Sequence, residues 1–296
     1  MTLPAYLAAL HHTWLVEAPD RRWRDDPGSL VFFDISGFTP LTERLASRGK
    51  IGAEELTDVL GAVFGQLLGA ADRFGGDTLK FGGDAVLLGF LGDDHEARAC
   101  AAAWAMQQVM RGTRRLKTSI GTVALRASCG VASGPIHAFL AGSVFDELVV
   151  GGPTTTSALT MEAAAHAGEI LVAPSTAAAL PVGVLGSPAG AGGRPLLGAP
   201  PASETALQRP LAEPERPGLQ PSLAPYLLHG AEGEHRQAAV AFLQYRGLDE
   251  FLAAHGPDST ATALGELLST VQDVCVRREV TIIGTDCDRG SGKVVL

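Results

Sequence analysis

Two short segments of the chain each place one aspartate at the end of an apolar run. The first reads Leu-Val-Phe-Phe-Asp-Ile-Ser-Gly-Phe-Thr-Pro over residues 30–40, and the second reads Leu-Lys-Phe-Gly-Gly-Asp-Ala-Val over residues 79–86. Asp34 is followed at once by a small turn and a helix start, whereas Asp84 follows a Gly-Gly turn between two strand-like runs. This arrangement brings two carboxylates together at a sheet edge, beside a ring of backbone N–H groups. A polyphosphate that carries two hard divalent cations needs such a site.

Composition restricts the class of protein that carries these aspartates. The chain has 296 residues, 46% of them hydrophobic, and is long enough for about two domains with a sizeable core. Its net charge of −9 argues against a nucleic-acid partner, because no basic stripe is present to displace counterions. The four scattered cysteines form no CxxC pair and are expected to be reduced in a cytoplasmic protein. Residues 170–193 are free of charge, but three prolines interrupt them, so we expect no membrane partner.

The hydrophobic periodicity predicts a mixed fold. A buried strand is expected over residues 30–34, and the spacing of Leu56, Leu60 and Leu67 predicts a helix over 53–73. The further expected elements are a hairpin over 77–90, a helix over 94–111, strands over 123–131 and 147–150, a helix over 155–167 and a strand over 169–172. An antiparallel hairpin between βα units favours an α+β fold with a ferredoxin-like, split βαβ sheet over a doubly wound sheet.

The opening pattern restarts late in the chain. Gln244-Tyr245-Arg246-Gly247 aligns with Asp34-Ile35-Ser36-Gly37, and a helix, a strand at 280–283 and a turn at 289–292 follow. Between the copies, residues 179–235 are dense in Pro, Gly and Ala and predict a mobile linker.

Four consecutive segments are therefore predicted. They are an N-terminal lead (1–28), a first domain (29–178), the linker (179–235) and the N-terminal part of a degenerate second copy (236–296). Because the second pattern stops at Leu296 with its sheet incomplete, we expect a longer protein or a partner to supply the remainder.

At these residues the chain resembles the class III nucleotidyl cyclases, which make cyclic AMP or cyclic GMP. The resemblance covers about residues 29–175 and recurs, degraded, in 236–296. Tandem unequal copies are most similar to the soluble adenylyl cyclase subgroup. The segments that carry the resemblance are 33–39, 80–84, 130–135 and 168–171.

The resemblance implies a two-metal cyclase site between two cyclase domains. Asp34 and Asp84 would hold two Mg²⁺ or Mn²⁺ ions with help from the Ile35 carbonyl. The N–H groups of Gly37, Phe38 and Thr39 would bind the β- and γ-phosphates of ATP or, less favoured, GTP. A second cyclase domain, in the same chain or in a dimer partner, would complete the site. The analogy also implies an ATPase and helical-repeat region downstream.

Several positions depart from the family pattern. Thr156 and Thr160 stand where an Asn and a transition-state Arg are expected, so the first domain would supply metal ligands only. In the second copy Gln244 replaces the first Asp, which predicts a pseudo-site that Lys80 of the first domain would face. The second hairpin has no Lys matching Lys80, and its Asp286 and Asp288 are expected to form turns. The fragment alone is therefore expected to be inactive.

Two other functions remain open at this point. A degenerate cyclase module would bind nucleotide or an effector and regulate an attached output domain without turnover. A diguanylate cyclase is the weaker alternative, because Gly82-Gly83-Asp84 echoes its Gly-Gly-Asp-Glu-Phe signature but Ala85-Val86 does not match Glu-Phe. Arg126, on a predicted strand, and Glu162, on a predicted helix, are expected to be surface charges.

Overall fold

The fold is known from a computed structural model, which describes residues 6–113, 116–228 and 238–296. The chain forms two compact units, and neither is a continuous stretch. Unit A comprises residues 28–134 and 157–207, and unit B comprises the described parts of 1–27, 135–156 and 208–296. The sequence pattern, in contrast, predicts consecutive domains. No described helix is long and apolar enough to cross a membrane.

Unit A is built on a sheet with the strand order β2-β3-β1-β6-β8-β9. Strand β3 lies antiparallel between β1 and β2, whereas β6 and β8 are parallel. This is the interleaving that a split βαβ sheet requires. The strands are β1 (Trp23–Ser36), β2 (Asp77–Gly82), β3 (Ala85–Leu91), β6 (Arg126–Ala141), β8 (Ile170–Val172) and β9 (Arg194–Pro195).

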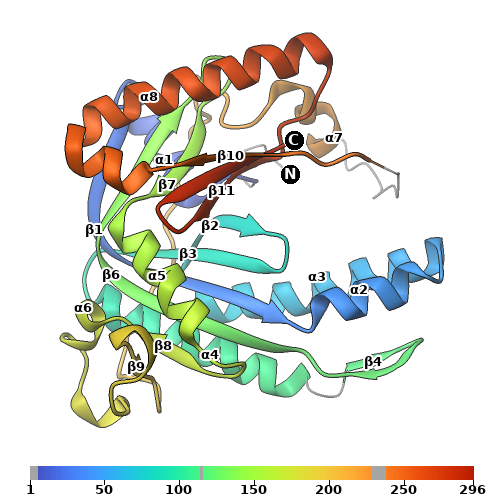
Figure 1. The fold of residues 1–296 in the computed structure, drawn as a ribbon, viewed down its shortest axis with the longest axis vertical. Coiled ribbons are helices and arrows are strands. Elements are labelled where there is room, and N and C mark those ends of the chain that lie inside the picture. The colour runs from blue at the N-terminus through green and yellow to red at the C-terminus, as the bar shows by residue number, and fades with distance from the viewer. Residues whose placement is uncertain (1–5, 114–115, 229–237) are drawn as a thin grey trace. The chain divides into compact units, whose positions relative to one another are not determined.

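Three helices pack against this sheet: α2 (Phe38–Ala46), α3 (Lys50–Asp72) and α4 (His95–Gly112) (Figure 1). The apolar positions that predict α3 do bury one face, since Val63 and Leu67 lie in the same core as Phe33 and Phe90. Two more helices follow, α5 (Pro153–Ala164) and α6 (Pro174–Ala177). The mixed α and β content is confirmed.

One feature of unit A carries no periodic signal in the sequence. A small hairpin, β4 (Leu116–Thr118) with β5 (Gly121–Val123), precedes β6. Its strands have three residues each, too few for an alternation to be recognised.

The segment predicted as a mobile linker differs from that expectation over its described residues. Strand β9 pairs with β8 in the sheet of unit A, and Leu196 is buried in its core. In unit B, the Asp146 N–H donates to the Pro217 carbonyl at 2.9 Å. Main-chain pairing holds this Pro- and Gly-rich chain in place, which its composition does not reveal. Residues 229–235 lie outside the described residues.

Unit B contains the C-terminal half of β6, which forms a hairpin with β7 (Glu147–Gly151). A second sheet has the order β10-β12-β11, the same relative order as β1-β3-β2. The expected strand at 280–283 is wrong: β11 begins at Gly284, after α8 has ended at an αL residue, Glu279. The elements of unit B are α1 (Ala9–Glu17), α7 (Ala224–Leu228), β10 (Phe242–Arg246), α8 (Leu248–Arg278), β11 (Gly284–Asp288) and β12 (Ser291–Val295).

One core joins these parts of unit B. Phe139 and Val149 from the β6–β7 hairpin pack in one apolar cluster with Leu264, Leu268 and Val294. Helix α8, drawn in orange and red in Figure 1, contacts β12 of the second sheet. The hairpin is thus as much a part of the unit B core as the helix.

Candidate active site

The two aspartates expected to act together lie on adjacent strand ends of unit A. Asp34 is near the end of β1 and pairs in register with Ala85, the residue that follows Asp84. The Ile35 N–H donates to the main-chain carbonyl of Asp84 at 3.1 Å. The β2–β3 turn is therefore hydrogen-bonded to the strand that carries the first carboxylate.

The electrostatics of Asp34 reflect this placement. Burial first, and then the negative charges of Asp84 and Glu162, together raise the pKa of the Asp34 carboxyl from 3.8 to about 6. A half-buried carboxylate beside like charges gains from a cation that neutralises the cluster. Such hard oxygen donors fit Mg²⁺ or Mn²⁺. Within the described residues, no group of three or more His, Cys, Asp or Glu side chains is arranged to hold a metal ion.

The turn after Asp34 has the geometry of an anion-binding helix start. Gly37 is the N-cap of α2 with φ +89° and ψ 3°, a left-handed conformation that favours glycine. The N-cap residue, Gly37, has no side chain that could accept a hydrogen bond from the first turn of the helix, and no side-chain cap is present. The N–H groups of that turn therefore point out of the helix end and can bind an external acceptor. They include the N–H groups of Gly37, Phe38 and Thr39, which the family resemblance leads us to expect at the phosphates.

The position of Lys80 can be compared between the two hairpins. Lys80 lies on β2 opposite Leu87, two register pairs from the turn. At the same distance from the turn of β11–β12, Asp286 lies opposite Lys293 and forms an ion pair with it at 2.9 Å. An aspartate therefore occupies the Lys80 position of the second hairpin.

This register corrects one expectation about the second hairpin. Asp286 is in the middle of β11 and therefore forms no turn. Its carboxylate instead makes the ion pair with the cross-strand Lys293. Asp288 does border the turn, where its carboxylate accepts the Arg289 N–H at 2.7 Å.

Glu162 is a contributor to the site that sequence reasoning missed. Its carboxylate accepts the Ser128 hydroxyl at 2.6 Å, and its charge raises the Asp34 pKa. The sequence signal is Gly130: a Cβ there would lie 2.1 Å from the Ala158 carbonyl. Only glycine allows α5 to pack so closely on β6, and this packing brings Glu162 beside Ser128.

Thr156 makes its contacts inside unit B. Its hydroxyl donates to the Asp249 carboxylate at 2.6 Å and accepts the Gly290 N–H at 2.9 Å. Gly247, the N-cap of α8 at φ +81°, matches the left-handed Gly37. However, the N–H groups of Gly247 and Leu248 already donate to the Gly290 carbonyl, at 3.1 and 2.9 Å. The first amides of this second turn are therefore bonded within the protein.

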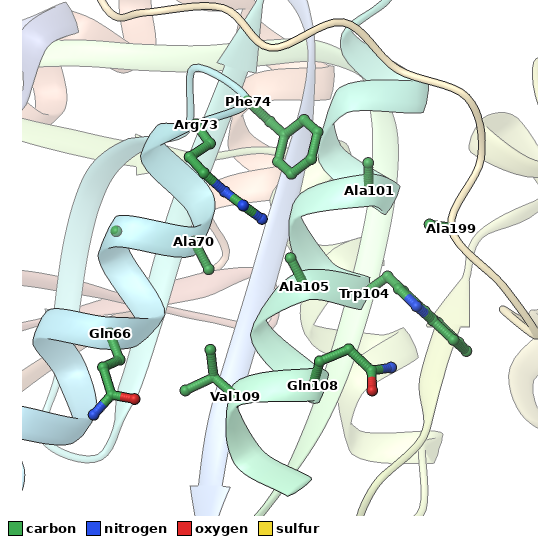
Figure 2. A pocket seen from close by; sticks show the side chains of 11 residues that line it. Gln66, Ala70, Arg73, Phe74, Ala101, Trp104, Ala105, Gln108, Val109 and Ala199 are labelled. Carbon is green, nitrogen blue, oxygen red and sulfur yellow. The ribbon is translucent and has the colours of Figure 1, made fainter. Parts of the chain in front are cut away.

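A groove of about 620 Å³ elsewhere in unit A contains none of the candidate site residues. It runs between α3 and α4 (Figure 2), with Arg73 and Phe74 at one end and Gln66 and Val109 toward the other. Its lining residues lie on α3, on α4, at the end of α3 and at Ala199, and none lies on β1 or in the β2–β3 turn.

Comparison with known proteins adds to this geometry. The sequence pattern of the Adenylate and Guanylate cyclase catalytic domain family matches residues 23–187. Human "Adenylate cyclase type 10" is 42% identical over 73 residues, which is 24% of this chain and 4% of that protein. Its rat counterpart is 44% identical over 62 residues, 20% of this chain and 4% of that protein. The matches thus span a small part of these curated relatives.

Among solved structures, a match with a TM-score above 0.5 supports the fold. A bacterial light-regulated adenylyl cyclase matches with a TM-score of 0.54 and 16% identity, covering 69% of this chain and 62% of that chain. The adenylyl cyclase CyaB from P. aeruginosa matches with a TM-score of 0.48 and 25% identity, covering 65% of this chain and all of that one (100%).

Proposed function

The chain belongs to the adenylate and guanylate cyclase catalytic domain family, and we propose that the full-length protein converts ATP, less favourably GTP, to the 3′,5′-cyclic nucleotide and pyrophosphate. One observation carries the proposal. Asp34 and Asp84 lie on adjacent strand ends, and the uncapped, left-handed Gly37 turn follows Asp34 directly. Carboxylates that bind divalent cations and amides that bind phosphate are thereby combined within a few residues.

Each part of this site has a distinct role. The carboxylates of Asp34 and Asp84 bind the divalent cations, with the Ile35 carbonyl as a further ligand. The N–H groups of Gly37, Phe38 and Thr39 hold the β- and γ-phosphates, which orients the α-phosphorus for in-line attack. Bound Mg²⁺ or Mn²⁺ supplies the charge that makes the ribose 3′-hydroxyl more acidic and stabilises the pyrophosphate.

A second cyclase domain completes the proposed site, because unit A has no Arg at the expected helix position. Thr156 and Thr160 stand where the family carries Asn and Arg, and a hydroxyl cannot replace a guanidinium at a charged phosphate. We assign residues 236–296 to the beginning of a degenerate second copy. Its strand, left-handed glycine, helix and hairpin repeat the order of the first copy, which supports the assignment.

The proposal is tested with Asp84→Asn in the full-length protein. With Mn²⁺ and ATP, we expect cyclic AMP formation to fall at least about a hundredfold, because one of two cation-binding carboxylates is lost. Asp58→Asn, exposed on α3, is the matched control and should retain wild-type activity. Undiminished product from Asp84→Asn would refute the proposed site, and parallel assays with GTP identify the purine.

A regulatory module without turnover is the second candidate. The Thr156 hydroxyl, at the position of the expected Asn, is engaged by Asp249 and Gly290, which favours a structural use of this helix end. This candidate predicts saturable nucleotide binding by calorimetry with no cyclic product from the full-length protein. Robust product formation would eliminate it.

A further inference from the structure

The tip of the β4–β5 hairpin is held by charged side chains from the helices beside it. The Glu55 carboxylate on α3 accepts the Ser119 N–H at 2.6 Å, and its other oxygen accepts the Ser119 hydroxyl. From the α2–α3 turn, the Arg48 guanidinium donates to the Ser119 carbonyl at 3.0 Å. Arg44, in the last turn of α2, donates to the Ile120 carbonyl at 3.0 Å. The tip is thus bound through main-chain groups on both sides.

The residue that follows the hairpin lies near the N-cap of α2. The Ala124 carbonyl, just after β5, lies 3.5 Å from the position that a Cβ on Gly37 would occupy. Leu125 then enters the core of unit A. Helix α2 begins at Phe38 and carries Arg44 in its last turn. The hairpin therefore contacts the last turn of α2 through Arg44, and the chain that leaves it passes near Gly37, the N-cap of α2.

Apolar packing holds the strands of the hairpin, since Leu116, Ile120 and Val123 are partly buried against the core of unit A. Lys117, Ser119, Gly121 and Thr122 are exposed, and a three-residue, two-stranded ribbon is not stable alone. At the exposed main chain of the tip, charge-assisted bonds from Glu55 and the two arginines add to this packing. The bonds from Ser119 also lower the pKa of Glu55, so the carboxylate is ionised at neutral pH.

We propose that Glu55 is a positioning residue for the phosphate-binding turn: by latching the β4–β5 tip to α3, it fixes α2 and thereby the amides of Gly37 to Thr39. The inference rests on the proposed function, since it assigns the latch a role in binding the polyphosphate. Loss of the latch lets α2 shift at its C-terminal end, and the amides at its N-terminal end then lose their alignment toward the phosphates.

The test compares Glu55→Gln with Glu54→Gln in the full-length protein. Gln keeps the shape of Glu55 but accepts with only one oxygen, so it cannot make both bonds to Ser119. Glu54 is its neighbour on α3, exposed and paired at 3.8 Å with Lys50, and among the described residues it makes no hydrogen bond or ion pair with the hairpin. The two variants remove the same charge one residue apart.

Two measurements are made on each variant. Hydrogen exchange of residues 116–123 reports whether the tip is held, and calorimetry with inorganic tripolyphosphate and Mn²⁺ reports the phosphate turn without requiring turnover. In Glu55→Gln we expect faster exchange of the hairpin and about tenfold weaker tripolyphosphate binding, with KM raised more than kcat is lowered. Glu54→Gln should match the wild type in both, and Glu55→Asp should recover part of the affinity.

The outcomes separate the latch from the proposed function. Faster exchange with unchanged tripolyphosphate affinity would overturn the positioning role, and unchanged exchange would overturn the latch itself. Equal weakening by Glu54→Gln would reduce the effect to net charge and also overturn the inference. If the wild type itself binds no tripolyphosphate, the proposed function is refuted, and the inference that rests on it is refuted as well. If only Glu55→Gln differs from these expectations, the proposed function stands and the positioning role of Glu55 is refuted.

Discussion

The ionised carboxylate of Asp34 is suited to bind a cation, but without a cation it lowers the stability of the folded state. Its carboxyl is half buried near two other carboxylates, which raises its pKa to about 6. Because this folded-state pKa is above the ordinary value of 3.8, the protonated form favours folding. That contribution is fully present below the unfolded pKa and is lost as the pH rises through about 6.

Asp34→Asn should therefore be more stable than the wild type at about pH 7.5 without divalent cations, by on the order of 1 kcal/mol after discounting for solvent screening. At about pH 3 the two should have nearly the same stability, because the wild-type carboxyl is then protonated in both the folded and the unfolded state. Urea unfolding at both pH values measures the difference. Added Mn²⁺ should stabilise the wild type alone, and equal midpoints at the higher pH would contradict this account.

At the scale of elements, Arg98 connects the turns that surround α4. It is only 5% exposed, and its guanidinium donates to the carbonyls of Asp93 (3.0 Å), Phe74 (2.9 Å) and Leu91. The turn before β2 and the turn after β3 are thereby held to one helix. Three carbonyl oxygens depend on this single side chain.

We expect Arg98→Ala to lower the free energy of unfolding by about 2–4 kcal/mol, because it leaves these partly buried acceptors without a donor. Arg111→Ala, in the last turn of the same helix, is the control and should cost less than about 1 kcal/mol, since that side chain is exposed. Urea midpoints compare the two variants. A loss from Arg98→Ala no larger than that of the control would show that water replaces the guanidinium.

At the scale of the whole molecule, the units do not follow the consecutive domains that the composition predicts. Phe139, Phe145 and Val149 belong to the sequence of the first copy but pack in the core of unit B with Leu248 and Leu268. The buried Gln272 of α8 reinforces this, since its side chain accepts the N–H groups of Ser143 and Val144 at 2.9 Å each.

We therefore expect that a fragment of residues 29–178 does not fold into a stable domain by itself. Without α8, the apolar side chains of the β6–β7 hairpin lose their cover, so we expect dye binding to exposed apolar surface and a broad thermal transition. The 296-residue chain serves as the reference in the same calorimetric and fluorescence measurements. A sharp, cooperative transition with no dye binding would show that the fragment folds independently.

The sequence alone determined the features that depend on near neighbours. The apolar periods predict α3 and α4 to within three residues at each end, and Gly37 with Gly247 marks the two left-handed turns. The Asp34 and Asp84 motifs likewise predict two strand ends that the register of β1 and β3 brings together. Each of these signals lies within one strand, turn or helix.

Only the tertiary structure decided which distant segments meet. Glu147 accepts the N–H of Thr285, 138 residues away, and Glu55 accepts that of Ser119, 64 residues away. From the sequence, Glu162 is expected to be a surface charge. In the structure, the close packing that Gly130 allows brings it beside Ser128. Such contacts arise from the pairing of sheet edges and the packing of cores. Strand pairing and core packing produce no periodicity or motif in the local sequence, because the partner of each residue depends on the tertiary fold.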